Sequence, residues 1–317
     1  MNRLHSQIHP LLTEEVVGTL HAKQVFTAAD FIKAEAQQLV KTARLNFKEV
    51  LALKKFLTKN FAPTPVNGLN YYKSVLSNSA IIPTGINSVD HILNGGLFTG
   101  NVYEICGLPN SGKTQFSLSL MKNVVQNMQQ QVYFFDTKSD FSAIKAKKLF
   151  SGHNQEHLQD YLSKVTVFRT YTRHELINGL YEVKNNLEND LKLRLIIIDS
   201  LPAVLFSSHD SSSNNSYLNH LVNLMRYISV EYQIVFLITN LVTTWSDGDF
   251  KKQQDHMEKI ACGRYWFTVP NTRLKIEKTN KENMFKISVL RSDIVNRKSQ
   301  DSVNIFLMDT GFVEQCK

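Results

Sequence analysis

The sequence predicts an α/β fold: a mostly parallel sheet flanked by helices, with an antiparallel C-terminal extension and a small N-terminal helical domain. Apolar runs at 195–198 and 234–238 alternate with amphipathic segments, which is typical of parallel strands buried on both faces. The runs 273–278 and 284–290 alternate apolar and polar residues around a polar turn and predict a hairpin. Residues 11–59 instead show helical periodicity.

The N-terminal helices follow from apolar spacing and a capping signal. Leu12, Val16 and Leu20 form one stripe at helical spacing, and Thr27 with Asp30 resembles a capping box at the start of the next helix. A further helical face is expected from Phe47, Val50, Leu51 and Leu57. This unit is either a docking or nucleic-acid-binding module or a passive cap on the main domain.

Composition changes divide the chain into three parts. These are an N-terminal helical domain at 1–59, a linker at 60–82 and a core at 83–317. Pro63 and Pro65 break regular structure at the start of the linker. Phe61, Tyr71 and Tyr72 are large side chains for a bare linker, so they either anchor in a partner's pocket or pack on the chain's own core.

Strands and helices are expected to alternate within the core. The strands are expected at 101–108, 131–137, 193–200 and 234–240, and the helices at 114–128, 175–188 and 216–232. The chain shows no internal repeat of fixed period, which argues against a solenoid or propeller.

The composition is that of a globular protein with excess positive charge. Hydrophobic residues make up 43% and charged residues 20%, which excludes a largely disordered, collagen-like or coiled-coil chain. The net charge of +8 favours a polyanionic partner. Cys106, Cys262 and Cys316 lack metal-site or redox spacing and are expected to be free thiols. Since there is neither a long apolar run nor an apolar signal core, we expect no membrane span and a cytosolic or nuclear protein.

Residues 107–114, GLPNSGKT, match the pattern G-x-x-x-x-G-K-[ST] of a phosphate-binding loop. Its glycines allow backbone N–H groups to turn inward around phosphates, and the following helix adds its positive dipole end. We expect Lys113 to bridge the β- and γ-phosphates of ATP and the Thr114 hydroxyl to hold Mg²⁺. The predicted nucleotide-binding residues are Gly107, Leu108, Pro109, Asn110, Ser111, Gly112, Lys113, Thr114 and Gln115.

A second metal-side group is expected at the end of a buried strand. The run LIIID places Asp199 at such an end, where a Walker B aspartate orders Mg²⁺ through its water shell. Alone, an aspartate after a core strand would suggest a helix cap. Beside a phosphate-binding loop, Asp199 and Thr114 predict a magnesium site.

Several motifs together resemble those of the RecA-type recombinase ATPases. They are the phosphate-binding loop, the strand ending in Asp199, and the pair Thr239-Asn240. Segments 82–100 and 263–273 are similar to the eukaryotic members. Within that family, LTEE at 12–15 and PVNG at 65–68 are most similar to the D-type paralogue. The resemblance covers nearly the whole chain and implies a RecA-like P-loop ATPase core.

The resemblance also implies partners and a biological role. Such a protein holds ATP between neighbouring subunits and joins other recombinase paralogues in a hetero-oligomer. It would act in homologous recombination and DNA repair, in the nucleus. Two loops would face single-stranded DNA, here at about 206–216 and 242–262, and both are polar and turn-rich as expected of mobile loops.

Two positions depart from the pattern of active recombinases. Lys138 stands where the resemblance places a glutamate that orients the attacking water, and a cation cannot accept the proton of that water. Asp136 and Asp140 are the nearest carboxylates in the sequence. Leu241 stands where a glutamine senses the γ-phosphate, and leucine has no hydrogen-bonding group. We therefore expect ATP binding with weak or absent hydrolysis.

Much of the positive charge lies in and after the second loop. Residues 251–300 hold twelve Lys or Arg against five Asp or Glu. The candidate contacts to DNA phosphates are Lys251, Lys252, Lys259 and Arg264, although each lysine could equally belong to a solvated surface. Trp245, Tyr265 and Trp266 have rings that could stack on bases, but Trp266 is expected in the core.

Three functions are compatible with these sequence features. The leading hypothesis is an ATP-binding paralogue that joins partner subunits and assists a recombinase on single-stranded DNA. The alternative is an active DNA-stimulated ATPase that performs strand exchange itself. A small-molecule kinase is disfavoured because the chain shows no arginine-rich lid segment.

Overall fold

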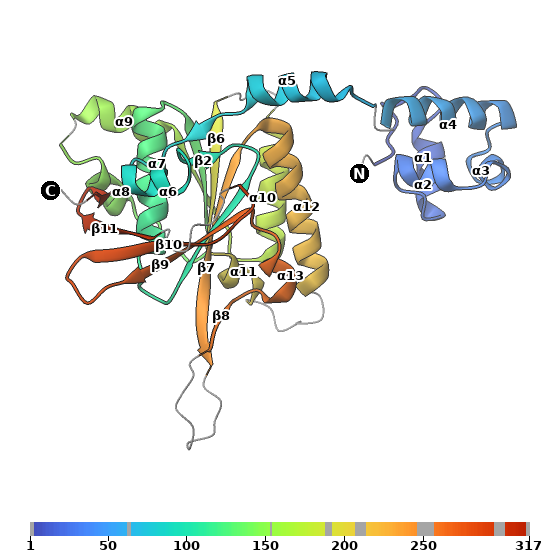
Figure 1. The fold of residues 1–317 in the computed structure, drawn as a ribbon. Coiled ribbons are helices and arrows are strands. Elements are labelled where there is room, and N and C mark those ends of the chain that lie inside the picture. Colours follow the sequence, from blue (N-terminus) through green and yellow to red (C-terminus); the bar gives the residue numbers. More distant parts are fainter. Residues whose placement is uncertain are drawn as a thin grey trace, which may run out of the picture. The chain divides into compact units, whose positions relative to one another are not determined.

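The computed structural model describes residues 3–61, 65–152, 154–187, 192–206, 214–245, 257–294 and 302–314 (Figure 1). The chain divides into two compact units, Met1–Ser74 and Val75–Lys317. The boundary between them falls inside helix α5 (Gly68–Asn78).

The first unit is built from short helices around a small apolar core. Its helices before α5 are α1 (Glu14–Ala22), α2 (Ala28–Lys33), α3 (Ala36–Ala43) and α4 (Phe47–Phe61). The predicted capping box is confirmed, because the side chains of Thr27 and Asp30 each accept the other's backbone N–H. The predicted face of α4 is partly wrong: Phe47 and Leu51 are exposed, and Leu53 is buried instead.

The segment predicted as a linker contains a helix. Asn67 caps α5, since its side-chain oxygen accepts the N–H of Leu69 at 2.9 Å. Every residue of α5 is at least partly exposed, including Tyr71 and Tyr72 at 58% and 59%. The two tyrosines therefore do not pack in the chain's own core.

The second unit is built on a mixed sheet. Its strands are β3 (Val102–Gly107), β4 (Gln131–Asp136), β5 (Val165–Arg169), β6 (Leu193–Asp199), β7 (Val235–Trp245), β8 (Met257–Ile260), β9 (Thr272–Lys278), β10 (Met284–Ser292), β11 (Ser302–Met308) and β12 (Gly311–Val313). Their order is β12-β11-β10-β9-β3-β7-β6-β4-β5, with β8 paired to β7. The strands from β9 to β5 in this order are parallel, whereas β10 to β12 add antiparallel pairs. This confirms the predicted fold class and the predicted hairpin of β9 and β10.

Helices cover both faces of the sheet. One face carries α6 (Asn87–Ile92), α7 (Lys113–Asn127), α8 (Ala143–Leu149) and α9 (Gln155–Ser163). The other carries α10 (Arg173–Asn186), α11 (Leu201–Leu205), α12 (Asn214–Tyr232) and α13 (Gly263–Phe267) (Figure 1). Strand β6 shows why the apolar run is continuous: Ile197 belongs to the first apolar cluster, and Ile196 and Ile198 belong to the second. A separate short ribbon, β1 (Ile81–Ile82) with β2 (Leu97–Phe98), adds to the first cluster.

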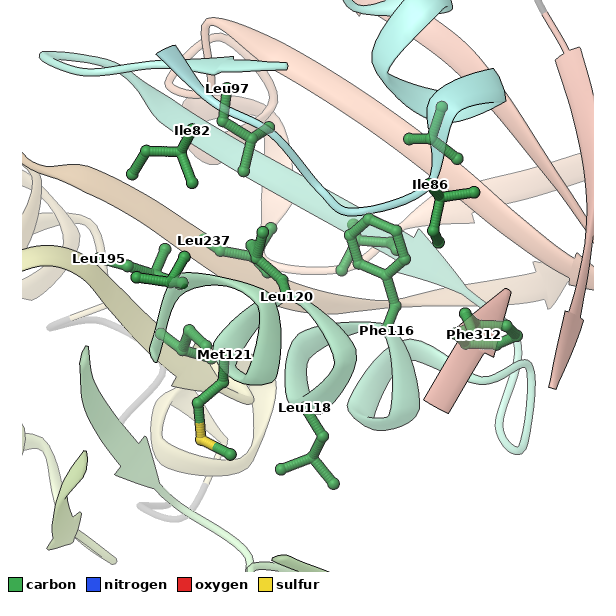
Figure 2. Close-up of a cluster of buried hydrophobic side chains, with 14 of the residues drawn as sticks. Ile82, Ile86, Leu97, Phe116, Leu118, Leu120, Met121, Leu195, Leu237 and Phe312 are labelled. Carbon is green, nitrogen blue, oxygen red and sulfur yellow. The ribbon is translucent and has the colours of Figure 1, made fainter. Parts of the chain in front are cut away.

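Helix α7 is fixed against the sheet by its apolar face. Phe116 and Leu120 belong to the same buried cluster as Leu195 and Leu237 (Figure 2). Burying each such side chain contributes about 1.5–3 kcal/mol to stability. At the helix's N-terminal end, the ring of Phe116 lies 6.5 Å from that of Phe312. The start of α7 is thus packed against β12 as well as against the central strands.

Candidate nucleotide-binding site

The predicted site residues meet at the carboxyl ends of the parallel strands. Strand β3 ends at Gly107 and β6 ends at Asp199. The strand register aligns Asp199 with Asp136 on β4, and Gly107 with Leu241 on β7. Ligands bind at this edge of open α/β sheets. The strand order therefore brings residues that are far apart in the sequence to one expected binding edge.

The loop between β3 and α7 has a conformation that requires glycine at both ends. A Cβ on Gly107 would lie 2.3 Å from the carbonyl oxygen of Ile276, and Gly112 has a φ of 94°. The first hydrogen bond of α7 runs from the Phe116 N–H to the Gly112 carbonyl at 2.9 Å. The N–H groups before Phe116 therefore have no acceptor within the helix, and they suit an anion.

A cleft of about 560 Å³ opens over this loop. It is lined by Pro109, Asn110, Ser111, Gly112, Lys113, Thr114, Gln115, Lys138, Asp140, Lys145, Ser200, Leu241, Phe285 and Leu307. Seven of the predicted nucleotide-binding residues, 109–115, are thus brought together. The other two, Gly107 and Leu108, do not line the cleft, but their carbonyl oxygens accept hydrogen bonds from Lys113.

Lys113 is folded back onto the loop. Its ammonium donates to the carbonyl oxygens of Gly107 at 2.9 Å and Leu108 at 2.6 Å. Burial, assisted by the nearby charge of Lys138, lowers the pKa of Lys113 to about 8. Phosphate oxygens would be stronger acceptors than these carbonyls because they carry charge.

Thr114 and Asp199, the two residues of the predicted magnesium site, are in direct contact. The Thr114 hydroxyl donates to one Asp199 carboxylate oxygen at 2.6 Å, and the Thr239 hydroxyl donates to the other at 2.6 Å. These are hard oxygen donors of the kind that Mg²⁺ prefers, so the residues present fit the ion. Among the described residues, no group of three or more His, Cys, Asp or Glu could hold a metal by itself. Phosphate oxygens and water molecules would complete the coordination shell, as is usual for Mg²⁺.

Lys138 points at Asp199 from the loop after β4. Its ammonium lies 3.3 Å from an Asp199 carboxylate oxygen and 3.0 Å from one of Asp140. Asp136 cannot serve as the missing base, because its carboxylate accepts the N–H groups of Lys138, Asp140 and Phe141 at 3.0 to 3.2 Å. That carboxylate is also buried, with 1% of the residue exposed.

A buried polar network beneath the loop was not anticipated from the sequence. Glu104 on β3 accepts from the Trp266 indole at 2.8 Å and from the Asn240 amide at 2.5 Å, and it pairs with Arg273 on β9. The amide of Asn240 also donates to the Ala261 carbonyl at 3.1 Å, beyond the end of β8. One signal was available: a charged residue inside the apolar strand VYEICG.

The second expected DNA loop is partly a β-hairpin. Strands β7 and β8 pair antiparallel from Val242 with Ile260 to Trp245 with Met257. The expectation of irregular structure over 242–262 is therefore wrong for its two ends. In the first loop, α12 already begins at Asn214, and 207–213 lie outside the described residues.

The candidate DNA contacts are only partly visible. Lys259 on β8 and Arg264 on α13 are exposed, whereas Lys251 and Lys252 lie outside the described residues. Trp266 is fully buried, as expected. Of the other two rings that could stack on bases, only that of Tyr265 belongs to a described side chain. The Tyr265 hydroxyl donates to Asn219 at 3.1 Å, and the side chain of Trp245 lies outside the described ones.

The structure also describes two of the three cysteines and the length and polarity of the helices. Cys106 and Cys262 are buried free thiols, as expected, and Cys316 lies outside the described residues. Burial raises the pKa of Cys106 to about 12. None of the described helices is long and apolar enough to span a bilayer.

The fold and the site define a RecA-like P-loop protein. A family model described as Rad51 matches residues 76–300, and the chain belongs to this family. A second model, the RAD51D N-terminal domain, matches residues 1–59. The predicted resemblance to the D-type paralogue is thereby confirmed.

Individual relatives agree with this assignment. The chain is 28% identical to mouse DNA repair protein RAD51 homolog 4 over 288 residues, covering 88% of this chain and 85% of the relative. It is 25% identical to human DNA repair protein RAD51 homolog 2 over 307 residues, covering 86% and 80% respectively. The crystal structure of the RadB recombinase superposes with a TM-score of 0.60 at 18% identity, covering 74% of this chain and all of that one. Proteins of the Rad51 family generally bind ATP with Mg²⁺.

Proposed function

We propose that the chain is an ATP-binding recombinase paralogue with weak or absent hydrolysis. It works as one subunit of a heteromeric complex that assists homologous recombination and DNA repair on single-stranded DNA, in the nucleus. Family membership and the names of the relatives, which are DNA repair proteins, support the biological role.

One observation supports the proposal: among the described residues, no glutamate lines the cleft, and its one lining carboxylate, that of Asp140, is paired with Lys138 at 3.0 Å. The Lys113 ammonium bonds a carbonyl of the phosphate-binding loop, and the Thr114 hydroxyl bonds the Asp199 carboxylate, as a site for a triphosphate and Mg²⁺ would have them. Lys138 and Leu241, by contrast, line the cleft where the family pattern has a glutamate and a glutamine. Neither an ammonium nor an alkyl group can orient a water for attack or sense a phosphate as an amide does.

In the proposed complex, ATP stabilises an interface between subunits. A ligand that contacts both partners adds its binding free energy to their association. Helix α5 offers a second contact, because its apolar residues Leu69, Tyr71, Tyr72 and Leu76 are 57% to 59% exposed. Exposed aromatic residues of this kind are frequent anchors at protein interfaces.

Single-stranded DNA is the proposed polyanionic partner. Lys259 and Arg264 are exposed on the base of the β7–β8 hairpin and on the helix that follows it. They lie within residues 251–300, where twelve basic residues outnumber five acidic ones. Replacing Arg264 by alanine should weaken binding of an oligonucleotide and reduce the salt slope of log Kd by about 0.7, the value for one phosphate contact.

Binding and turnover are tested together with three proteins: wild type, Lys113→Ala and Lys113→Arg. Wild type should bind a fluorescent ATP analogue, Lys113→Ala should lose that binding, and Lys113→Arg should keep most of it because the charge remains. Wild-type turnover should stay far below one per second, the low end of ordinary enzyme rates. Turnover at or above that rate, with or without DNA, would instead support an active ATPase.

Assembly is tested by co-purification with candidate recombinase paralogues, with and without ATP and Mg²⁺. Wild type should retain its partners better when ATP is present, and Lys113→Ala should lose this gain. If Lys113→Ala retains partners as well as wild type in ATP, the nucleotide does not act at the interface.

A further inference from the structure

Lys138 lies in the nucleotide cleft with no counterpart in the usual set of P-loop residues. Its ammonium is 3.3 Å from Asp199 and lines the same cleft as Lys113 and Thr114. We propose that Lys138 is a resident cation of this site, which pairs with the terminal phosphate of a bound nucleoside triphosphate and makes binding only weakly dependent on Mg²⁺. This inference rests on the nucleotide binding proposed above.

The backbone around Lys138 is held in place by neighbouring strand ends. The Thr137 N–H donates to the Asp199 carbonyl at 3.0 Å, and the Thr137 hydroxyl bonds both the N–H and the carbonyl of Ser200, at 2.6 and 2.8 Å. On its other side, the Lys138 N–H donates to the buried Asp136 carboxylate at 3.2 Å. The lysine is therefore aimed at the end of β6 by a fixed turn, unlike a lysine on an open surface.

Lys138 carries its charge at neutral pH. Its ammonium lies 3.0 Å from a carboxylate oxygen of Asp140 and 3.3 Å from one of Asp199, and opposite charges this close favour the charged form of a lysine. The side chain remains 32% exposed, so it can turn from these carboxylates toward an entering anion. A triphosphate carries more negative charge than the two carboxylates and would compete for the ammonium.

The charge balance of the cleft differs from that of an ordinary Mg²⁺–triphosphate site. Three lysines line the cleft: Lys113, Lys138 and Lys145. Two carboxylates oppose them: that of Asp140, which also lines the cleft, and that of Asp199, which bonds Thr114 at its base. Lys138 offsets the charge of Asp199, which weakens the attraction of that carboxylate for a divalent cation. The same ammonium supplies positive charge beside the phosphates, which is the electrostatic contribution that Mg²⁺ otherwise makes.

The test measures Kd for a fluorescent ATP analogue by anisotropy, in saturating MgCl₂ and in excess EDTA. The full chain is compared with Lys138→Met, which keeps volume without charge, and with Lys138→Arg, which keeps charge. Wild type should lose less than about threefold in affinity when EDTA replaces Mg²⁺, and Lys138→Met should lose about tenfold or more. Lys138→Arg should behave like wild type.

Lys145→Met is the matched control, since Lys145 is exposed in the same cleft with its ammonium 3.5 Å from the Asp140 carbonyl. It should weaken binding by one common factor in both buffers. The inference is overturned if wild type loses as much affinity in EDTA as Lys138→Met, or if Lys145→Met shows the same metal dependence as Lys138→Met. Failure of every protein to bind in MgCl₂, with unchanged thermal unfolding, would instead refute the proposed function itself.

Discussion

Replacing Arg273 by methionine should destabilise the second unit strongly, because the change leaves a buried charge without its partner. Arg273 and Glu104 are 1% and 0% exposed and form an ion pair between β9 and β3. The guanidinium also donates to the Phe267 carbonyl at 3.2 Å and lies 4.7 Å from the ring of Phe267. Methionine would fill the volume but provide none of these interactions.

The expected loss in the free energy of unfolding is about 3–5 kcal/mol, the usual effect of removing one member of a buried pair. Glu104 keeps two donors, the Trp266 indole and the Asn240 amide, so the lower end of that range applies. At about 2–4 °C per kcal/mol for a unit of this size, the unfolding temperature should fall by roughly 6–12 °C.

Thermal unfolding followed by tryptophan fluorescence measures this effect, since the indole of Trp266 belongs to the network. Glu277→Gln is the matched control on the same strand: it breaks the pair with Lys275 at 2.8 Å, in which Glu277 is 44% exposed. The Glu277 carboxylate faces solvent, although Lys275 is only 13% exposed, and glutamine keeps an acceptor for the ammonium, so the loss should be about 1 kcal/mol.

The double variant Glu104→Gln with Arg273→Met separates charge from packing. Glutamine keeps an acceptor for the indole and removes the uncompensated charge, so the double variant should be more stable than Arg273→Met alone. If Arg273→Met unfolds within about 1 kcal/mol of wild type, or if adding Glu104→Gln lowers stability further, the buried pair does not stabilise the unit as described.

Three other predictions concern the phosphate-binding loop and the thiols. Gly107→Ala should abolish binding of the ATP analogue and lower the unfolding temperature, because its Cβ would lie 2.3 Å from the backbone oxygen of Ile276; binding equal to wild type would contradict the loop geometry. Phosphates bind the ammonium form of Lys113 and raise its pKa above about 8, so affinity should be constant well below that pH and fall as the pH rises through it. Titrations at several pH values test this, with Lys113→Arg as a control that should show a flat profile over the same range. Cys106 and Cys262 should resist iodoacetamide in the folded protein and react after unfolding, because both are buried and burial raises the pKa of each thiol; peptide mapping that finds either one modified under native conditions would show the site to be open.

Elements with a strong local signal were predicted well. Residue type and spacing alone indicate the end of the apolar strand at Asp199 and the turn at 107–114. The helix α5 was missed, because its start at Gly68 follows two prolines and its polar face resembles a loop. The strands β7 and β8 were missed beyond Asn240 for a related reason: the segments LVTTW and MEKI show no regular apolar alternation, and pairing between the two strands stabilises them instead.

The sequence alone determined the phosphate-binding loop, the aspartate that ends its neighbouring strand, and the layered order of strands and helices. These depend on backbone conformation and apolar periodicity, which are properties of short segments. Three features emerge only from the folded structure: Lys138 pairs with Asp199, the Asp136 carboxylate caps a turn, and Glu104 and Arg273 form a buried pair. Such contacts join residues as many as 169 positions apart, and the sheet register that brings them together is set by packing of the whole core.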